Sequence, residues 1–181
     1  MQSSVQTHID SLITERVPKL RVATFDPGGT TGYCIAELSD DALDIYALEA
    51  QLSMSAMDFL LDSIVRQDNA PLHIIYEDFT YRNYARMGLD LTPVKLIGII
   101  ELYSDRFEPS VSFYKQSAAT GKAFWSDEKL KAKDVYAKGR KHARDAVRHF
   151  MQWATFGPGS QYMTLDKLTL RLHLPKKDWR E

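Results

Sequence analysis

The sequence is poor in cysteine and in long hydrophobic stretches, and each shortage excludes a class of protein. Cys34 is the only cysteine among 181 residues, so no intrachain disulfide can form, which is typical of a reducing compartment. No segment approaches the roughly 20 apolar residues that span a bilayer. The first residues include Asp10 and Glu15 and lack a long apolar core, so they do not form a secretory signal. We therefore expect a cytoplasmic protein that does not bind membranes, with Cys34 as a small buried residue of a strand.

The sequence also has almost no net charge, at −1, but the charges are unevenly distributed. Residues 115–150 contain ten Lys and Arg against four Asp and Glu, a net charge of +6 that leaves −7 for the rest of the chain. Such asymmetry favours a surface that binds phosphate groups. A solvated lysine-rich face would produce the same composition, so the charge alone does not decide between them.

Hydrophobic periodicity predicts one mixed α/β domain, which also suits the length of the chain. A polar N-terminal arm, residues 1–19, precedes a domain over residues 20–156, and an ambiguous C-terminal tail follows over residues 157–181. Apolar runs and turn residues predict strands at 20–26, 31–38, 44–50, 72–79 and 109–114. Amphipathic patterns predict helices at 55–66, 91–103 and 140–155. A Pro-Gly-Gly turn joins the first two strands, so we expect the first three strands to form an antiparallel meander.

Acidic residues stand at the ends of two predicted strands and on the last helix. Asp26 ends the first strand immediately before the turn, and Glu77 lies near the end of the fourth. His142 and Asp145 are three residues apart, so they share one face of the last helix. Sites in open α/β sheets usually lie at strand ends, so we expect these four side chains to meet.

Carboxylate ligands of this kind suit Mg²⁺ or Mn²⁺. Two divalent ions about 4 Å apart can activate a water molecule and stabilise the charged transition state of phosphodiester hydrolysis. Asp26, Glu77 and Asp145 would supply the oxygens and His142 an imidazole, which makes all four candidate catalytic and metal-binding residues. Each has a plainer explanation when taken singly, as a turn residue, a surface acid or a local hydrogen bond. Their combination favours a nuclease with two metal ions in its site.

Three motifs resemble those of the RuvC-type Holliday junction resolvases. They are Asp-Pro-Gly-x-Thr-x-Gly-Tyr from Asp26, Tyr-Glu-x-Phe from Tyr76, and His-x-x-Asp-Ala from His142. The resemblance extends from about Leu20 to Phe156. It implies an RNase H-like fold, with a five-stranded mixed sheet flanked by helices. It also implies Mg²⁺- or Mn²⁺-dependent nicking of four-way DNA junctions by a homodimer. The setting would be a bacterial or phage-infected cell, and we expect a phage-type member.

The same resemblance suggests which residues contact DNA. The stretch from Lys115 to Ala123 is similar to the family's basic loop, which makes Lys115 and Lys122 candidate phosphate contacts, and Arg144 is a further candidate within the basic segment. Family members carry an aromatic residue just after the acid of the fourth strand. Phe79, Tyr81 and Tyr84 compete for that role, and the spacing does not choose among them.

Other functions remain open at this point. A nuclease of the same fold could act on flaps, replication forks or structured RNA, and a junction-binding module could have lost its activity. An ATPase of the sugar-kinase and actin superfamily shares the Asp-x-Gly-x-Thr start, but normally needs a second, similar subdomain. The N-terminal arm and the C-terminal tail have no counterpart in the typical resolvase.

Overall fold

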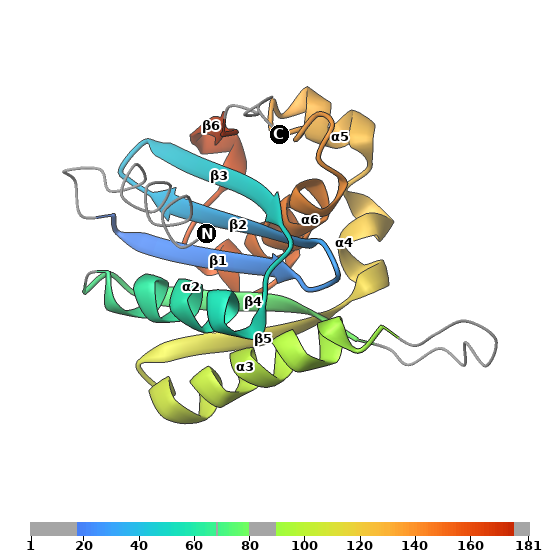
Figure 1. Cartoon of the computed structure of the whole chain (residues 1–181). Helices are drawn as coiled ribbons and strands as arrows, with labels where there is room; N and C mark the ends of the chain where they lie inside the picture. Colours follow the sequence, from blue (N-terminus) through green and yellow to red (C-terminus); the bar gives the residue numbers. More distant parts are fainter. Residues whose placement is uncertain (1–17, 68, 80–89, 176–181) are drawn as a thin grey trace.

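A six-stranded sheet forms the centre of the computed structural model, which describes residues 18–67, 69–79 and 90–175 (Figure 1). The strand order is β5-β4-β1-β2-β3-β6. The first three strands form the predicted antiparallel meander, and β4 and β5 run parallel to β1. The strands are β1 (Leu20–Asp26), β2 (Thr31–Leu38), β3 (Ala42–Ala50), β4 (Leu72–Asp78), β5 (Val111–Ser117) and β6 (Thr169–His173).

The expected sheet had five strands, and β6 is the one that the sequence analysis missed. It pairs in parallel with β3, from Ala42 opposite Thr169 to Tyr46 opposite His173. Its five residues lie at the edge of the sheet and are half-buried or exposed, so they carry little of the apolar pattern that marks a strand. Part of the segment interpreted as a tail therefore belongs to the sheet.

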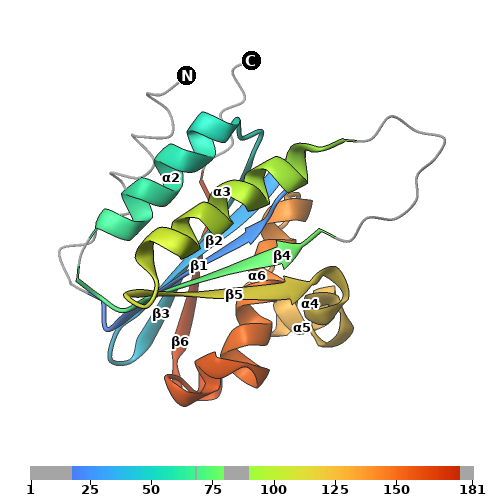
Figure 2. The same cartoon turned by 90° about the horizontal axis from the view of Figure 1, so that it is seen from below.

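Helices cover both faces of the sheet (Figure 2). On one face lie α2 (Met54–Arg66) and α3 (Thr92–Phe107), and on the other lies α6 (Lys141–Phe156). The segment between β5 and α6 holds two short helices, α4 (Ala118–Phe124) and α5 (Asp127–Ala132), which the sequence analysis had not assigned. No helix among the described residues is long and apolar enough to span a membrane.

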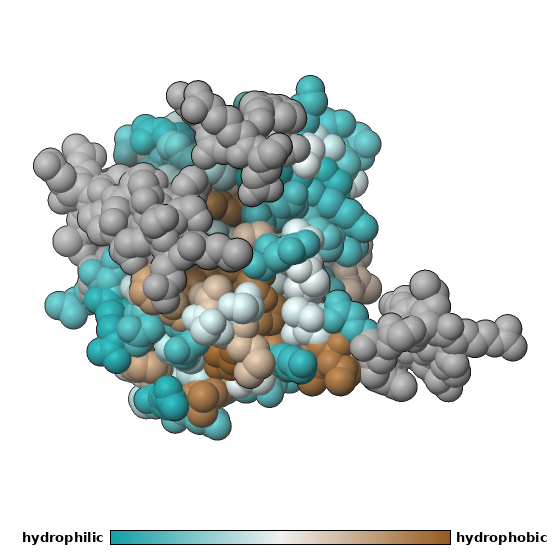
Figure 3. Space-filling view, in the orientation of Figure 1, coloured by the Kyte–Doolittle hydropathy of each residue, from teal (hydrophilic) through white to brown (hydrophobic). Residues whose placement is uncertain are grey.

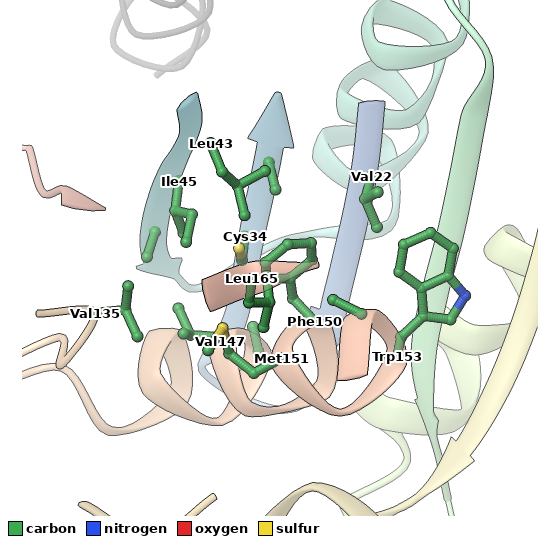
Figure 4. Packing of buried hydrophobic residues seen from close by; sticks show 14 of the residues in the cluster. Val22, Cys34, Leu43, Ile45, Val135, Val147, Phe150, Met151, Trp153 and Leu165 are labelled. Atoms are coloured by element: carbon green, nitrogen blue, oxygen red, sulfur yellow. The ribbon is translucent and has the colours of Figure 1, made fainter. Parts of the chain in front are cut away.

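Each face of the sheet has its own hydrophobic core. The core under α6 includes Cys34, Phe150 and Trp153, which are almost fully buried (Figure 4). Burial raises the pKa of the Cys34 thiol to about 12, so it is an inert core residue, as its place in a strand predicted. Side chains of a strand alternate between the two faces. Asp26 and Glu77 therefore lie on the α6 face, because Phe25 and Tyr76 belong to the core under α2 and α3.

Candidate active site

A rigid turn presents Asp26 at the end of β1. The Thr31 hydroxyl accepts a hydrogen bond from the Gly28 amide at 3.3 Å and donates to the Gly28 carbonyl at 3.1 Å. Asp26 pairs with Gly32 across the antiparallel ladder. The side chain of Asp26 is therefore anchored at the edge of the core, where it is largely buried.

The first turn of α6 packs directly on β2, and Gly32 makes this approach feasible. A Cβ atom on Gly32 would lie 1.9 Å from the carbonyl oxygen of His142, well inside van der Waals contact. This proximity brings His142 Nδ1 to 3.0 Å from Asp26 Oδ2. Further along the helix, the Thr24 hydroxyl donates to the Ala146 carbonyl at 2.8 Å. The helix is thus fixed to the two strands that carry the first motif.

Glu49 caps the N-terminus of α6 from the third strand. Its Oε2 accepts hydrogen bonds from the His142 amide at 3.0 Å and the Ala143 amide at 3.4 Å. A carboxylate at this position satisfies free amides and interacts favourably with the helix dipole. Glu49 pairs with Gly32 across the ladder, so a row of three paired positions, Asp26, Gly32 and Glu49, positions the start of the helix. Glu49 is not among the residues that the sequence predicts for the site.

Glu77 lies on the same face and contacts α6 through His149. His149 Nε2 is 2.8 Å from Glu77 Oε2, and His149 Nδ1 is 2.9 Å from Gln116 Oε1. Asp78, the next residue of β4, points to the opposite face, where its carboxylate lies 3.7 Å from Lys115 Nζ. Strand alternation thus places Glu77, rather than Asp78, on the face of the sheet that α6 covers.

Asp145 is buried and is neutralised by two cations. One carboxylate oxygen contacts the Arg148 guanidinium, and the other lies 3.2 Å from Lys122 Nζ. Arg148 also contacts Asp127 and donates from Nε to the Trp125 carbonyl at 2.9 Å. The arginine is therefore held by three partners from the α4–α5 segment and α6.

The charges of Glu77 and Asp145 act on the carboxyl group of Asp26. The pKa of Asp26 is raised above its ordinary value by burial first, then by the negative charge of Glu77, with a smaller contribution from Asp145. The hydrogen bond with His142 lowers it in part. Among the described residues, no three Asp, Glu, His or Cys side chains already form a group that could hold a metal ion. The acids thus lie in one region, each turned towards a basic partner.

The predicted DNA contacts lie on different sides of this region. Lys122 is at the site, beside Asp145. Lys115 lies on the α3 face, 2.9 Å from Glu101. Arg144 is mostly buried between Asp127 and the ring of Tyr136. Phe79 follows β4 and packs partly against the core under α3, whereas Tyr81 and Tyr84 lie outside the described residues.

An RNase H-like arrangement follows from this topology, with an antiparallel meander, two parallel strands beside it, and acids from β1, β4 and the last helix on one face. Comparison with solved structures agrees: RuvC of T. thermophilus in complex with Holliday junction substrate matches with a TM-score of 0.52. The identity is 13%, over 76% of this chain and 96% of that one. The yeast mitochondrial Holliday junction resolvase Ydc2 matches with a TM-score of 0.47 and 15% identity, over 90% of this chain and 91% of that one.

No family model and no curated protein matches the sequence. The likeness to RuvC therefore confirms the expected RNase H-like fold.

Proposed function

We propose that this protein is a structure-selective endonuclease that nicks four-way DNA junctions by metal-dependent hydrolysis of phosphodiester bonds. The observation that carries the proposal is the placement of Asp26, Glu77 and Asp145 on the α6 face of an RNase H-like sheet. The structure with a similar fold contains a Holliday junction, which supports the choice of substrate.

The donor set fits Mg²⁺ or Mn²⁺. Both ions prefer carboxylate oxygens. The pKa of Asp26 is raised by burial first and then by the negative charge of Glu77, and a bound cation would stabilise the ionised carboxylates. Asp26, Glu77 and Asp145 would hold the metal, with His142 as a further ligand. When bound, divalent ions stabilise charge on the phosphate and activate water. Binding requires Asp26 to exchange its contact with His142 and Asp145 its contact with Lys122, since the described residues contain no ready-made group.

We expect two ions per site, with Asp26, Glu77 and Asp145 as the carboxylate ligands and His142 as the imidazole ligand. His142 is the more accessible of the two histidines in this region, with 35% of its side chain exposed. It can therefore exchange its contact with Asp26 for a metal ion without opening the core.

Lys122 is the best placed of the predicted DNA contacts, because it lies beside Asp145 and half of its side chain is exposed. A phosphate brought to the acids would come within reach of this lysine. Lys115 and Phe79 lie towards the α3 face at the same end of the sheet, so we expect them to contact DNA outside the site. Arg144 is held by Asp127 and Tyr136, and it would need to leave them to reach a phosphate.

Two symmetric nicks in a four-way junction require two active sites, so we propose a two-fold homodimer. Helix α3 carries an exposed stripe that suits such an interface, formed by Leu91 at its N-cap, Val94, Gly98 and Leu102. Figure 3 shows apolar surface over α3 and the neighbouring α2. Ile99, on the same helix, packs partly against the core, so it is not part of this stripe.

The test is a nicking assay on a synthetic four-way junction, with Mg²⁺ or Mn²⁺ and with linear duplex, flap and structured RNA substrates beside it. We expect symmetric nicks in the junction and loss of cleavage in Asp26→Asn and Asp145→Asn, with junction binding kept within a few-fold. Preferential cleavage of flaps or RNA would refute the four-way junction as the substrate but support the proposed hydrolysis of phosphodiester bonds. Junction binding without any cleavage would indicate an inactive binding module.

A further inference from the structure

A buried histidine lies directly behind Glu77 and is not needed by the chemistry described above. His149 belongs to α6, and only 1% of its side chain is exposed. Its Nε2 lies 2.8 Å from Glu77 Oε2 and its Nδ1 lies 2.9 Å from Gln116 Oε1. An ionised carboxylate can only accept a hydrogen bond, so Nε2 is the donor to Glu77.

The two partners of His149 come from neighbouring strands at one level of the sheet. Glu77 of β4 is paired with Gln116 of β5, and the Gln116 amide also donates to the His149 carbonyl at 3.4 Å. One side chain of α6 therefore joins the helix to both strands. The plainer explanation, a core histidine with satisfied hydrogen bonds, accounts for the contact with Gln116. It does not account for the choice of a candidate metal ligand as the second partner.

We propose that His149 is a positioning residue, which, together with Gln116, orients the carboxylate of Glu77 for metal binding. This inference rests on the proposed metal-dependent function. His149 Nε2 contacts Oε2, so Oε1 would be the oxygen of Glu77 that this hydrogen bond leaves available to an ion. In many metal sites a histidine is the ligand and a carboxylate orients it from behind; here the two groups exchange these roles.

The contrast with His142 supports a division of labour between the two histidines. His142 contacts Asp26 from a partly exposed position at the start of α6, whereas His149 is enclosed by the core two turns further along. A buried donor that is lost leaves its acceptor without a partner. The orientation of Glu77 should therefore depend on His149 more strongly than that of Asp26 depends on His142.

The experiment measures Mn²⁺ binding by the metal-free full chain, without DNA, by calorimetry or electron paramagnetic resonance. The variants are His149→Leu, which removes the donor, and His149→Gln, whose amide can still donate to Glu77. His73→Leu is the matched control, because His73 is also a buried histidine on the α6 face, where it packs against Trp153 rather than an acid. Loss of an orienting partner typically weakens metal binding 10- to 100-fold.

We expect His149→Leu to weaken Mn²⁺ binding by about 10-fold or more, His149→Gln to stay within a few-fold of wild type, and His73→Leu to match wild type. In a Glu77→Gln background, His149→Leu should have no further effect, because the two residues act as one unit. If His149→Leu fails to fold, Gln116→Leu tests the same chain of contacts and should weaken binding in the same direction.

Wild-type affinity for Mn²⁺ in His149→Leu would overturn the inference. Equal losses of affinity in His149→Leu and His149→Gln, with lower melting temperatures in both, would also overturn it, because His149 would then have a purely structural role. Because no DNA is present, this result is separate from the nicking assay. A wild-type protein that binds Mn²⁺ but cleaves no junction would refute the proposed substrate and leave the role of His149 standing. A wild-type protein that binds no Mn²⁺ would overturn both.

Discussion

Asp26→Asn should make the metal-free protein more stable while removing its stabilisation by divalent ions. The Asp26 carboxyl is largely buried, and its pKa is raised by burial and by the charges of Glu77 and Asp145, which outweigh the hydrogen bond with His142. An acid whose pKa is higher in the folded than in the unfolded protein destabilises the fold once it is ionised. Asparagine keeps the shape of the side chain without the charge, so it removes this penalty.

The stability difference between Asp26→Asn and the wild-type protein should increase with pH. Close to the ordinary aspartate pKa of 3.8, Asp26 is largely protonated in the folded protein, and the two proteins should differ little. The advantage of the variant should grow as the pH rises towards the raised pKa and stay constant above it. A tenfold change in the ionisation equilibrium corresponds to about 1.4 kcal/mol, and each kcal/mol moves the melting temperature of a chain of this length by about 2–4 °C. Calorimetry between pH 4 and pH 8, with a chelator present, measures the difference.

A divalent ion should reverse the order of stability, so that the wild-type protein becomes more stable than Asp26→Asn. An ion at ten times its Kd stabilises the folded state by about 1.4 kcal/mol, so the wild-type melting temperature should rise by about 3–6 °C and that of the variant should not. Asp62→Asn is the control, because Asp62 pairs with Arg66 on the surface of α2, where ion pairs contribute little. An Asp26→Asn protein that is less stable than wild type at pH 8, or that responds equally to the ion, would refute the reasoning.

Three further outcomes follow from the geometry. Gly32→Ala should displace the first turn of α6, because its Cβ would lie 1.9 Å from the His142 carbonyl. A shift of about 1 Å can reduce turnover about 100-fold, and turnover within a few-fold of wild type would contradict this role of Gly32. Lys122→Gln should reduce the log-log salt slope of junction binding by about one, and an unchanged slope would remove Lys122 from the phosphate contacts. Leu102→Glu should convert a dimer into a monomer in light scattering at micromolar concentration, and a wild-type protein that is monomeric even on junction DNA would exclude the dimer.

The parts of the fold that the sequence predicted are those with strong local signals. The first four strands, and the helices now seen as α2, α3 and α6, have clear apolar periods and lie within a few residues of their predicted bounds. The short helices α4 and α5 and the edge strand β6 lack such periods. Ser126 does cap α5 through its side chain, but a helix of six residues has too few apolar positions to show a stripe.

The residues of the candidate site likewise fall into two groups, those with a local sequence signal and those without one. Asp26 and Glu77 could be found because a strand end followed by a turn is a local pattern, and His142 and Asp145 because three residues separate them on a helix. Glu49 and His149 could not be found in this way. Each acts across the fold, Glu49 on an amide 93 residues away and His149 on a carboxylate 72 residues away. Contacts of this kind depend on how α6 crosses the sheet, which no local pattern specifies.

The basic partners of the acids give the site an accessible side and an enclosed side. His142 and Lys122 have 35% and 50% of their side chains exposed, whereas Arg148 and His149 have 11% and 1%. An exposed partner can leave its carboxylate at the cost of a weak surface contact, but a buried one would leave an unpaired charge or donor in the core. The exchangeable partners are those at the start of α6 and on α4. We therefore infer that metal and DNA approach from that side, while Arg148 and His149 keep the carboxylates of Asp145 and Glu77 in place.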